Sequence, residues 1–231
     1  MVKILVSTVG EVSIFDTIES IKEHANRDYR MIIWYSCVEP FNQAFFDRLR
    51  AVTPDVIVST SNKSVAHVFG SLLIYEKYDY FVNINPDNIV NPKFMDKVIR
   101  PFEENEKVAV SGGIFADRFV GDYILDMEAI LPDEILMLSR EAVNELGAHG
   151  AFFGTYGHEI MEFMPRAMKK GWHIASVKGL GYHNKELHAG RDKHKNLEEL
   201  IDINTKVFYQ AKNRGFEGYN WFSDRIGEKV I

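Results

Sequence analysis

Residues 80–92 read YFVNINPDNIVNP, a hydrophobic strand that ends abruptly in polar side chains. Asp87 is the only acid of this polar cluster, and the amides Asn85 and Asn88 are close to it in sequence. Carboxylate and amide oxygens are hard ligands that suit Mg²⁺ or Mn²⁺, and substrate phosphates commonly complete such sites. Asn, Pro and Asp also favour turns for local reasons. The cluster therefore fits either a divalent metal site or a simple turn.

A second group of chemically capable side chains follows a glycine-rich aromatic loop late in the chain. Glu159 starts a predicted helix over 159–171, and Glu162 and Arg166 follow on the same helical face. A carboxylate at a helix N-terminus stays ionised and can accept a proton. The helix dipole alone also favours an acid there. Glu159 therefore fits either a general base or a helix-starting acid.

The first half of the chain must position Asp87, and it alternates strands with helices. Strands are predicted at 2–8, 31–36, 55–60, 80–84 and 107–115, and helices at 12–25, 42–52, 64–78 and 91–105. In the last helix, Asn91 is the expected cap and Pro92 the first helical residue. This alternation indicates βαβ units and a mostly parallel sheet. Because ligands of open parallel sheets bind beyond the carboxyl ends of the strands, Asp87 is well placed for binding.

The second half has a different pattern and no linker that would separate it from the first. Its predicted elements are short strands, helices at 139–147, 159–171 and 197–215, a strand at 173–179 and a polar stretch at 182–196. We therefore expect one domain with a more specialised second half.

The composition is that of an ordinary globular protein. The 231 residues are 46% hydrophobic and 26% charged, with a formal net charge of −6 that does not indicate a broad nucleic-acid surface. No apolar stretch approaches the roughly 20 residues of a membrane helix, and MVKILVSTVG reads as a strand rather than a signal peptide. The single cysteine, Cys37, permits no internal disulfide, so we expect a reducing, cytoplasmic setting.

The order and separation of these motifs resemble the glycosyltransferases of the GT-A fold, in particular family 2, whose inverting enzymes use nucleotide-sugar donors. In that family a strand ends in an Asp-x-Asp metal motif, where this chain has Asn85-Pro86-Asp87, and a helix then starts near a proline, here Pro92. The later family motif has a Glu-Asp pair, an acid, an arginine, a glycine and, after a strand, a histidine. The residues at those spacings here are Glu159, Glu162, Arg166, Gly171 and His183. The resemblance covers roughly residues 2–213.

The resemblance implies the GT-A fold, an α/β fold with a mostly parallel central sheet flanked by helices and a small acceptor-side subregion. It implies a metal-dependent hexosyl- or pentosyltransferase that moves a sugar from a nucleotide-diphosphate-sugar to a hydroxyl acceptor: a glycan or, in second place, a modified nucleobase or protein. The implied cofactor is Mn²⁺ or Mg²⁺, held by Asp87 and His183 against the donor diphosphate. The single domain, 1–231, then comprises a nucleotide-binding half (1–114), an acceptor and catalytic half (115–196), and a C-terminal helix and tail (197–231). The tail segment FEGYNWFSDRI is expected to dock on the body or on a second subunit.

The resemblance also places a set of residues around the donor: Thr8, Val9, Gly10, Tyr35, Ser36, Asn62, Lys63, Asn85 and Arg191. The first three leave the first strand toward base and ribose, and the pair after the third strand helps to read the base. Asn85 supports ribose or metal, and Arg191 closes over the diphosphate unless it is merely a solvated charge. Ser36 is placed to bond the ribose, and Tyr35 either stacks on the base or packs in the core.

The chain departs from the family at the usual general base, because Ile160 stands where the family has Asp. Glu159 is then the expected base and His158 the reserve, and either an inverting or a retaining outcome remains open. Two other functions also fit. One is a nucleotidyltransferase of related fold, disfavoured because the first loop, TVGEVSIF, lacks Arg and Lys. The other is a non-catalytic nucleotide-sugar-binding module, which the missing Asp favours.

Overall fold

The computed structural model describes residues 1–37, 40–59, 68, 72–73, 75–114, 120–126, 135–147 and 163–184. The predicted helix over 197–215 lies wholly outside these residues, and the one over 64–78 lies largely outside them. The start of the helix predicted over 159–171 and most of the polar stretch 182–196 also lie outside them.

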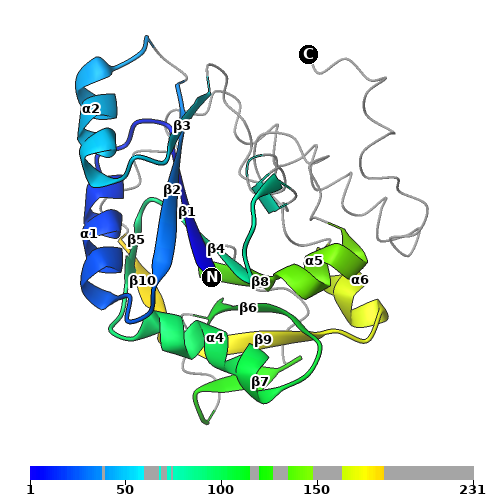
Figure 1. Ribbon diagram of the computed structural model, residues 1–231. Coiled ribbons are helices and arrows are strands. Elements are labelled where there is room, and N and C mark those ends of the chain that lie inside the picture. Colours follow the sequence, from blue (N-terminus) through cyan, green and yellow to red (C-terminus); the bar gives the residue numbers. More distant parts are fainter. Residues whose placement is uncertain are drawn as a thin grey trace, which may run out of the picture.

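Strands and helices alternate from β1 to β3 as the sequence predicts, and α4 again separates β5 from β6 (Figure 1). In chain order they are β1 (Val2–Thr8), α1 (Ile14–His24), β2 (Tyr29–Ser36), α2 (Gln43–Val52), β3 (Val56–Ser59), β4 (Tyr80–Ile84), β5 (Asn88–Val90), α4 (Phe94–Glu104), β6 (Val108–Ile114), β7 (Tyr123–Leu125), β8 (Ile135–Ser139), α5 (Arg140–Leu146), α6 (Phe163–Lys169), β9 (His173–Lys178) and β10 (Gly181–His183).

The described strands form one large sheet and one small ribbon. The large sheet has the order β3-β2-β1-β4-β8-β6-β9-β7. Strands β1 to β4 run parallel, as βαβ units require. Strand β8 enters between β4 and β6 and is antiparallel to both, whereas β6 and β9 are again parallel and β7 closes the edge antiparallel to β9. The expected mostly parallel sheet is confirmed.

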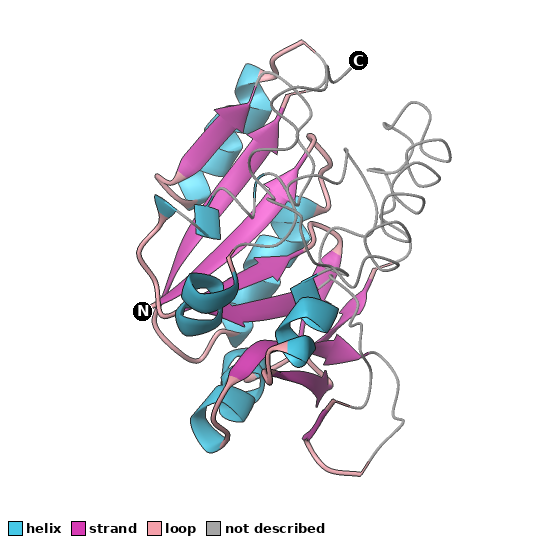
Figure 2. Ribbon diagram, turned by 90° about the vertical axis from the view of Figure 1, so that its right-hand side faces the viewer, coloured by secondary structure: helices cyan, strands magenta, loops and turns pink. Residues whose placement is uncertain are grey.

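Helices cover both faces of this sheet (Figure 2), and the alternation of side chains along β1 shows why. Ile4 and Val6 point into a core cluster shared with α1 and α4. Leu5 points the other way, into a cluster shared with α5 and α6. Because both faces are buried, the strand reads as a continuous apolar run rather than an alternating one. None of the helices in the described part of the chain has the length and apolar character needed to span a membrane.

The helix predicted over 91–105 begins later than expected. It starts at Phe94, and Lys93 at the N-cap has a left-handed backbone with φ of 61°. Asn91 is therefore not the cap. Its backbone N–H donates to the Leu180 carbonyl at 2.8 Å, and its side-chain amide donates to the Gly179 carbonyl at 3.2 Å. A contact with a distant segment thus replaces the local cap.

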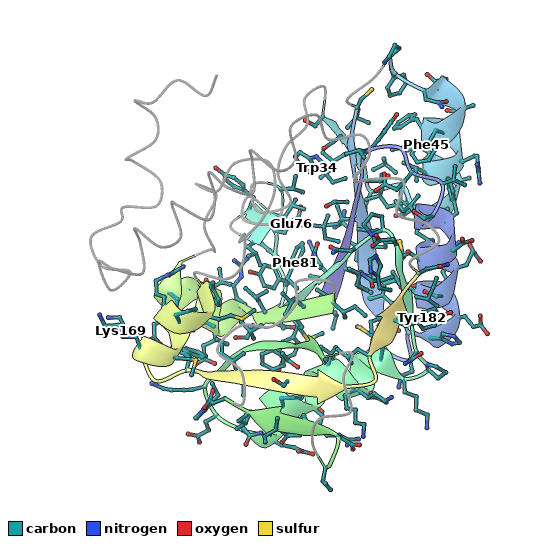
Figure 3. All side chains as sticks on the ribbon, turned by 180° about the vertical axis from the view of Figure 1, so that it is seen from behind. Trp34, Phe45, Glu76, Phe81, Lys169 and Tyr182 are labelled. Carbon is teal, nitrogen blue, oxygen red and sulfur yellow. The ribbon has the colours of Figure 1, made fainter. Side chains whose placement is uncertain are left out.

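A charged side chain of the central strand β1 is buried. Lys3 of β1 is only 2% exposed, and its ammonium contacts the carboxylate of Glu76. Glu76 is 29% exposed and is labelled in Figure 3. Nearby, the guanidinium of Arg140 donates to the Leu73 carbonyl at 2.7 Å and lies 4.1 Å over the ring of Tyr78. Burial raises the pKa of Tyr78 to about 12, against the lowering effect of Arg140. These contacts attach the segment before β4 to β1 and α5.

Candidate functional site

Asp87 and His183 are distant in sequence and adjacent in the structure. Oδ2 of Asp87 lies 2.8 Å from Nε2 of His183, and the two side chains are 23% and 20% exposed. The backbone N–H of Asn184 donates to the carbonyl of Asp87 at 2.9 Å. The predicted convergence of these two side chains is thus confirmed, and their binding of a metal stays a prediction.

A short ribbon brings the two side chains together. Asp87 lies in a turn after β4, in which the Asn88 N–H donates to the Asn85 carbonyl at 3.2 Å. Strand β5 then begins at Asn88 and pairs antiparallel with β10, in a register that sets His183 opposite Asn88. His183 is therefore beside the residue that follows Asp87. The side chain of Asn88 is fully buried, whereas the amide oxygen of Asn85 accepts a hydrogen bond from Asn83 at 3.2 Å.

Gly181 is the point of closest approach in this ribbon. A Cβ there would stand 2.4 Å from the carbonyl oxygen of Ile89 and 2.9 Å from Cδ1 of Ile135. The first of these atoms is backbone, so it cannot move aside without displacing β5. Only glycine fits this position.

We expect Gly181→Ala to separate β10 from β5 and to withdraw His183 from Asp87. Overpacking of this kind costs roughly 1–3 kcal/mol, which corresponds to about a tenfold or larger rise in local hydrogen exchange. Exchange measured by mass spectrometry on peptides covering 88–90 and 181–183 checks this. Gly113→Ala is the matched control, since its Cβ meets only Leu180 at an ordinary 3.4 Å. Equal hydrogen-exchange rates of these peptides in the two variants would show that Gly181 does not hold β10 against β5.

The geometry of the pair suits a divalent ion that takes few protein ligands. Neighbouring ligands of an octahedral ion at about 2.1 Å stand about 3 Å from each other. The 2.8 Å between Oδ2 of Asp87 and Nε2 of His183, which are hydrogen-bond partners in this structure, is close to that value. Within the described ranges, no group of three or more His, Cys, Asp or Glu side chains is arranged to hold a metal. An ion here would take its other ligands from water and substrate phosphates, as Mg²⁺ usually does.

The loop after β1 is organised by a buried carboxylate that our sequence analysis did not single out. Oε2 of Glu11, which is 6% exposed, accepts hydrogen bonds from the Thr8 hydroxyl at 2.6 Å and the Val9 N–H at 2.7 Å. The Gly10 N–H donates to the Thr8 hydroxyl at 3.0 Å, and Gly10 has a φ of 103°. Polar groups of Thr8, Val9 and Gly10 are thus engaged within the loop. The Thr-x-x-Glu spacing of Thr8 and Glu11 is the sequence pattern that could have predicted this contact.

At the end of β2, the two residues expected near the donor are buried. The ring of Tyr35 is 4% exposed and packs on Phe41 and Phe45, with ring centroids 6.2 and 5.2 Å away. Tyr35 therefore packs in the core, which was the alternative to base stacking. Ser36 is 3% exposed, and its hydroxyl accepts a hydrogen bond from the Trp34 indole at 3.2 Å.

Several predicted site residues lie outside the described residues, and their roles stay predictions: His158, Glu159, Glu162, Asn62, Lys63 and Arg191. Arg166 is described. Its guanidinium donates to the Leu146 carbonyl and lies 5.2 Å from the ring of Phe163, so it joins α6 to the end of α5.

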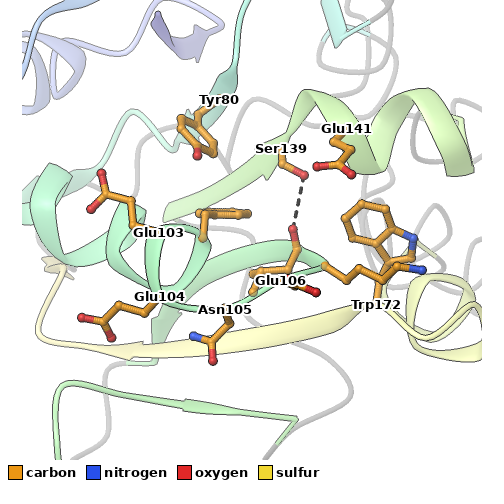
Figure 4. A pocket seen from close by; sticks show the side chains of 11 residues that line it. Tyr80, Glu103, Glu104, Asn105, Glu106, Ser139, Glu141 and Trp172 are labelled. Atoms are coloured by element: carbon orange, nitrogen blue, oxygen red, sulfur yellow. Dashed lines mark hydrogen bonds between the residues drawn. The ribbon is translucent and has the colours of Figure 1, made fainter.

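A separate cavity of about 450 Å³ (Figure 4) lies near the amino-terminal ends of β4 and β9. Its lining includes Tyr80 and Trp172, at or just before the starts of β4 and β9, together with Glu106 and Glu141. Because Asp87 follows the end of β4, this cavity is not part of the candidate site.

Comparison with known proteins identifies the fold. No protein-family model and no curated protein matches the chain. Among solved structures, a mannosyltransferase from Pyrobaculum calidifontis, in complex with GDP-Man and Mn²⁺, matches with a TM-score of 0.62 and 14% identity. The match covers 82% of this chain and 59% of that one.

A second solved structure is similar over more of its length. Glucosyl-3-phosphoglycerate synthase from Mycobacterium tuberculosis, in complex with Mg²⁺ and UDP, matches with a TM-score of 0.64 and 16% identity, over 95% of this chain and 81% of that one. At such identities the likeness shows the fold alone. The chain therefore has the GT-A fold, as its sequence resemblance predicts.

Proposed function

We propose that the protein is a metal-dependent glycosyltransferase, which transfers a sugar from a nucleotide-diphosphate-sugar donor to a hydroxyl acceptor. The observation that carries the proposal is the Asp87–His183 pair, with 2.8 Å between Oδ2 and Nε2, directly beyond the end of β4. On an open α/β sheet, ligands bind beyond these carboxyl ends of the strands.

The position of the pair on the fold supports the proposal further. Strands β1, β2 and β4 are parallel, so their carboxyl ends lie on the same side of the sheet. The Glu11 loop, the end of β2 and Asp87 are therefore all on that side. The similar mannosyltransferase was solved with GDP-Man and Mn²⁺, and the similar synthase with UDP and Mg²⁺. A nucleotide diphosphate along this side would bring its phosphates to Asp87 and His183.

In the proposed reaction, Asp87 and His183 would hold Mn²⁺ or Mg²⁺, which would supply Lewis-acid stabilisation of the leaving nucleoside diphosphate. The acceptor hydroxyl attacks the anomeric carbon, the bond from that carbon to the diphosphate breaks, and Glu159, or His158 in reserve, accepts the hydroxyl proton. Glu11 keeps the β1 loop in its bonded conformation while the donor binds. The acceptor is a glycan or, in second place, a modified nucleobase or protein.

Release of nucleoside diphosphate from UDP-, GDP- and TDP-sugars tests the proposal. We expect one donor class to be turned over with Mn²⁺ and not with EDTA. The same donor should raise the apparent free energy of unfolding by about 2.7 kcal/mol at a hundred times its Kd. Turnover that requires pyrophosphate would indicate a nucleotidyltransferase instead. Donor binding without turnover would indicate a binding module, and no binding of any donor would contradict the proposal entirely.

A further inference from the structure

We propose that Ser20 and Lys97 are positioning residues for the Asp87–His183 pair. They act through the β5–β10 ribbon, defined as residues 88–90 and 181–183, which begins one residue after Asp87 and ends at His183. The inference rests on the proposed function, because it gives the pair a metal ion to hold.

The ribbon is too short to hold its own position. Each strand has three residues, and the ribbon is separate from the eight-stranded sheet of the described chain. Even longer two-stranded ribbons are only marginally stable in water. Contacts from neighbouring elements must therefore decide where the ribbon, and His183 with it, lies.

Ser20 attaches the ribbon to α1. The side chain is 7% exposed; its hydroxyl donates to the Thr17 carbonyl at 2.8 Å and accepts from the Val90 N–H at 3.1 Å. Val90 pairs with Gly181 across the ribbon. The N–H of Val90 therefore links this strand pair to a side chain of α1. Leaving that buried N–H without an acceptor would destabilise this end of the ribbon. Ser20 thus fixes the end of β5.

Lys97, on α4, contacts the turn that leads into β10, the second strand of the ribbon. Its ammonium donates to the Gly179 carbonyl at 3.1 Å, and the Asn91 amide donates to the same oxygen at 3.2 Å. Gly179 has a φ of 65° and forms the turn between β9 and β10. This carbonyl is the partner found for the Lys97 ammonium among the described residues. Lys97 thus fixes the turn from which β10 starts.

The two contacts matter for metal binding because the pair consists of only two side chains, one in the turn just before β5 and one at the end of β10. A shift of β5 or β10 changes the separation of Oδ2 and Nε2, which at 2.8 Å now suits neighbouring positions on one ion. Residues that orient metal ligands typically contribute 10- to 100-fold to metal affinity, roughly. We expect effects at the lower end, because each anchor acts on one strand alone.

The test compares two variants with two matched controls. Ser20→Ala and Lys97→Met remove the anchoring groups. Thr17→Val is the control on α1, since the fully buried Thr17 hydroxyl has no hydrogen-bond partner within the described residues. Lys170→Met is the control for the lysine, because Lys170 is exposed in the turn after α6. Binding of MnCl₂, with and without UDP, is measured by electron paramagnetic resonance, and hydrogen exchange is measured on peptides covering the ribbon.

We expect each test variant to raise the Kd for Mn²⁺ about tenfold and ribbon exchange about tenfold, with both controls within about twofold of the unmodified protein. Unchanged ribbon exchange in the test variants would overturn the positioning role and leave the proposed function standing. Faster exchange with unchanged Mn²⁺ affinity would overturn it as well. An unmodified protein that binds no Mn²⁺ would overturn the proposed function, and the positioning role with it.

Discussion

Asp87→Asn is expected to lower donor turnover by about 10²- to 10³-fold at any attainable Mn²⁺ concentration. The amide keeps the shape of the side chain but loses the negative charge that attracts a divalent ion. Bound metal contributes several kcal/mol to stabilising transition-state charge, and about 3–4 kcal/mol corresponds to this loss of rate. The measurement is the rate of nucleoside diphosphate release from whichever of the UDP-, GDP- and TDP-sugars the unmodified protein turns over.

The chain offers a matched control for this substitution. Asp126 and His173 form a second Asp–His pair, with 2.6 Å between Oδ2 and Nδ1, at the amino end of β9. Asp126→Asn changes a carboxylate to an amide in the same kind of pair, away from the carboxyl ends of the parallel strands. We expect it to keep turnover within about twofold of the unmodified protein. Equal losses in the two variants would show that Asp87 has no special part in the reaction.

Glu76→Ala is expected to give the largest loss of stability. It leaves the Lys3 ammonium, on a residue that is 2% exposed, without its carboxylate partner. Removing one member of a buried ion pair costs about 3–5 kcal/mol. We expect about 3 kcal/mol, the low end of that range, because Glu76 is 29% exposed and water can enter the vacated space. The free energy of unfolding, measured in urea, provides the test.

A double variant separates the buried charge from the loss of packing. In Lys3→Met with Glu76→Leu both charges are replaced by apolar groups, and such replacements are often neutral or stabilising. We expect it to recover most of the stability lost in Glu76→Ala. If the double variant is as unstable as the single one, the loss comes from packing at Glu76 and not from an uncompensated ammonium.

The regular part of the fold could be predicted because its signals are local. The apolar runs of β1, β2 and β4 and the intervening helical patterns are each long enough to recognise. Strands β5 and β10 have three residues each, too few for any periodicity. Their pairing depends on the absence of a Cβ at Gly181, a contact with Ile89 that no local pattern records.

The candidate site was predictable to the extent that its residues match a family pattern. Asp87 and His183 were placed together by resemblance, and the structure confirms that they meet. Tyr35 was ambiguous because β2 is covered on both faces, so an aromatic near its end can belong to either the core or the surface. Asn91 was misassigned because its side chain serves the Gly179 turn, which comes much later in the chain.

The insertion of β8 between β4 and β6 has a consequence for how the chain folds as it is made. Residues 80–84 pair on one side with β1, but their other side waits for residues 135–139. During synthesis, β4 therefore stands as an apolar edge with unsatisfied backbone groups until more than fifty further residues have left the ribosome. We therefore expect the nascent amino-terminal half to be the form of this protein most prone to aggregation.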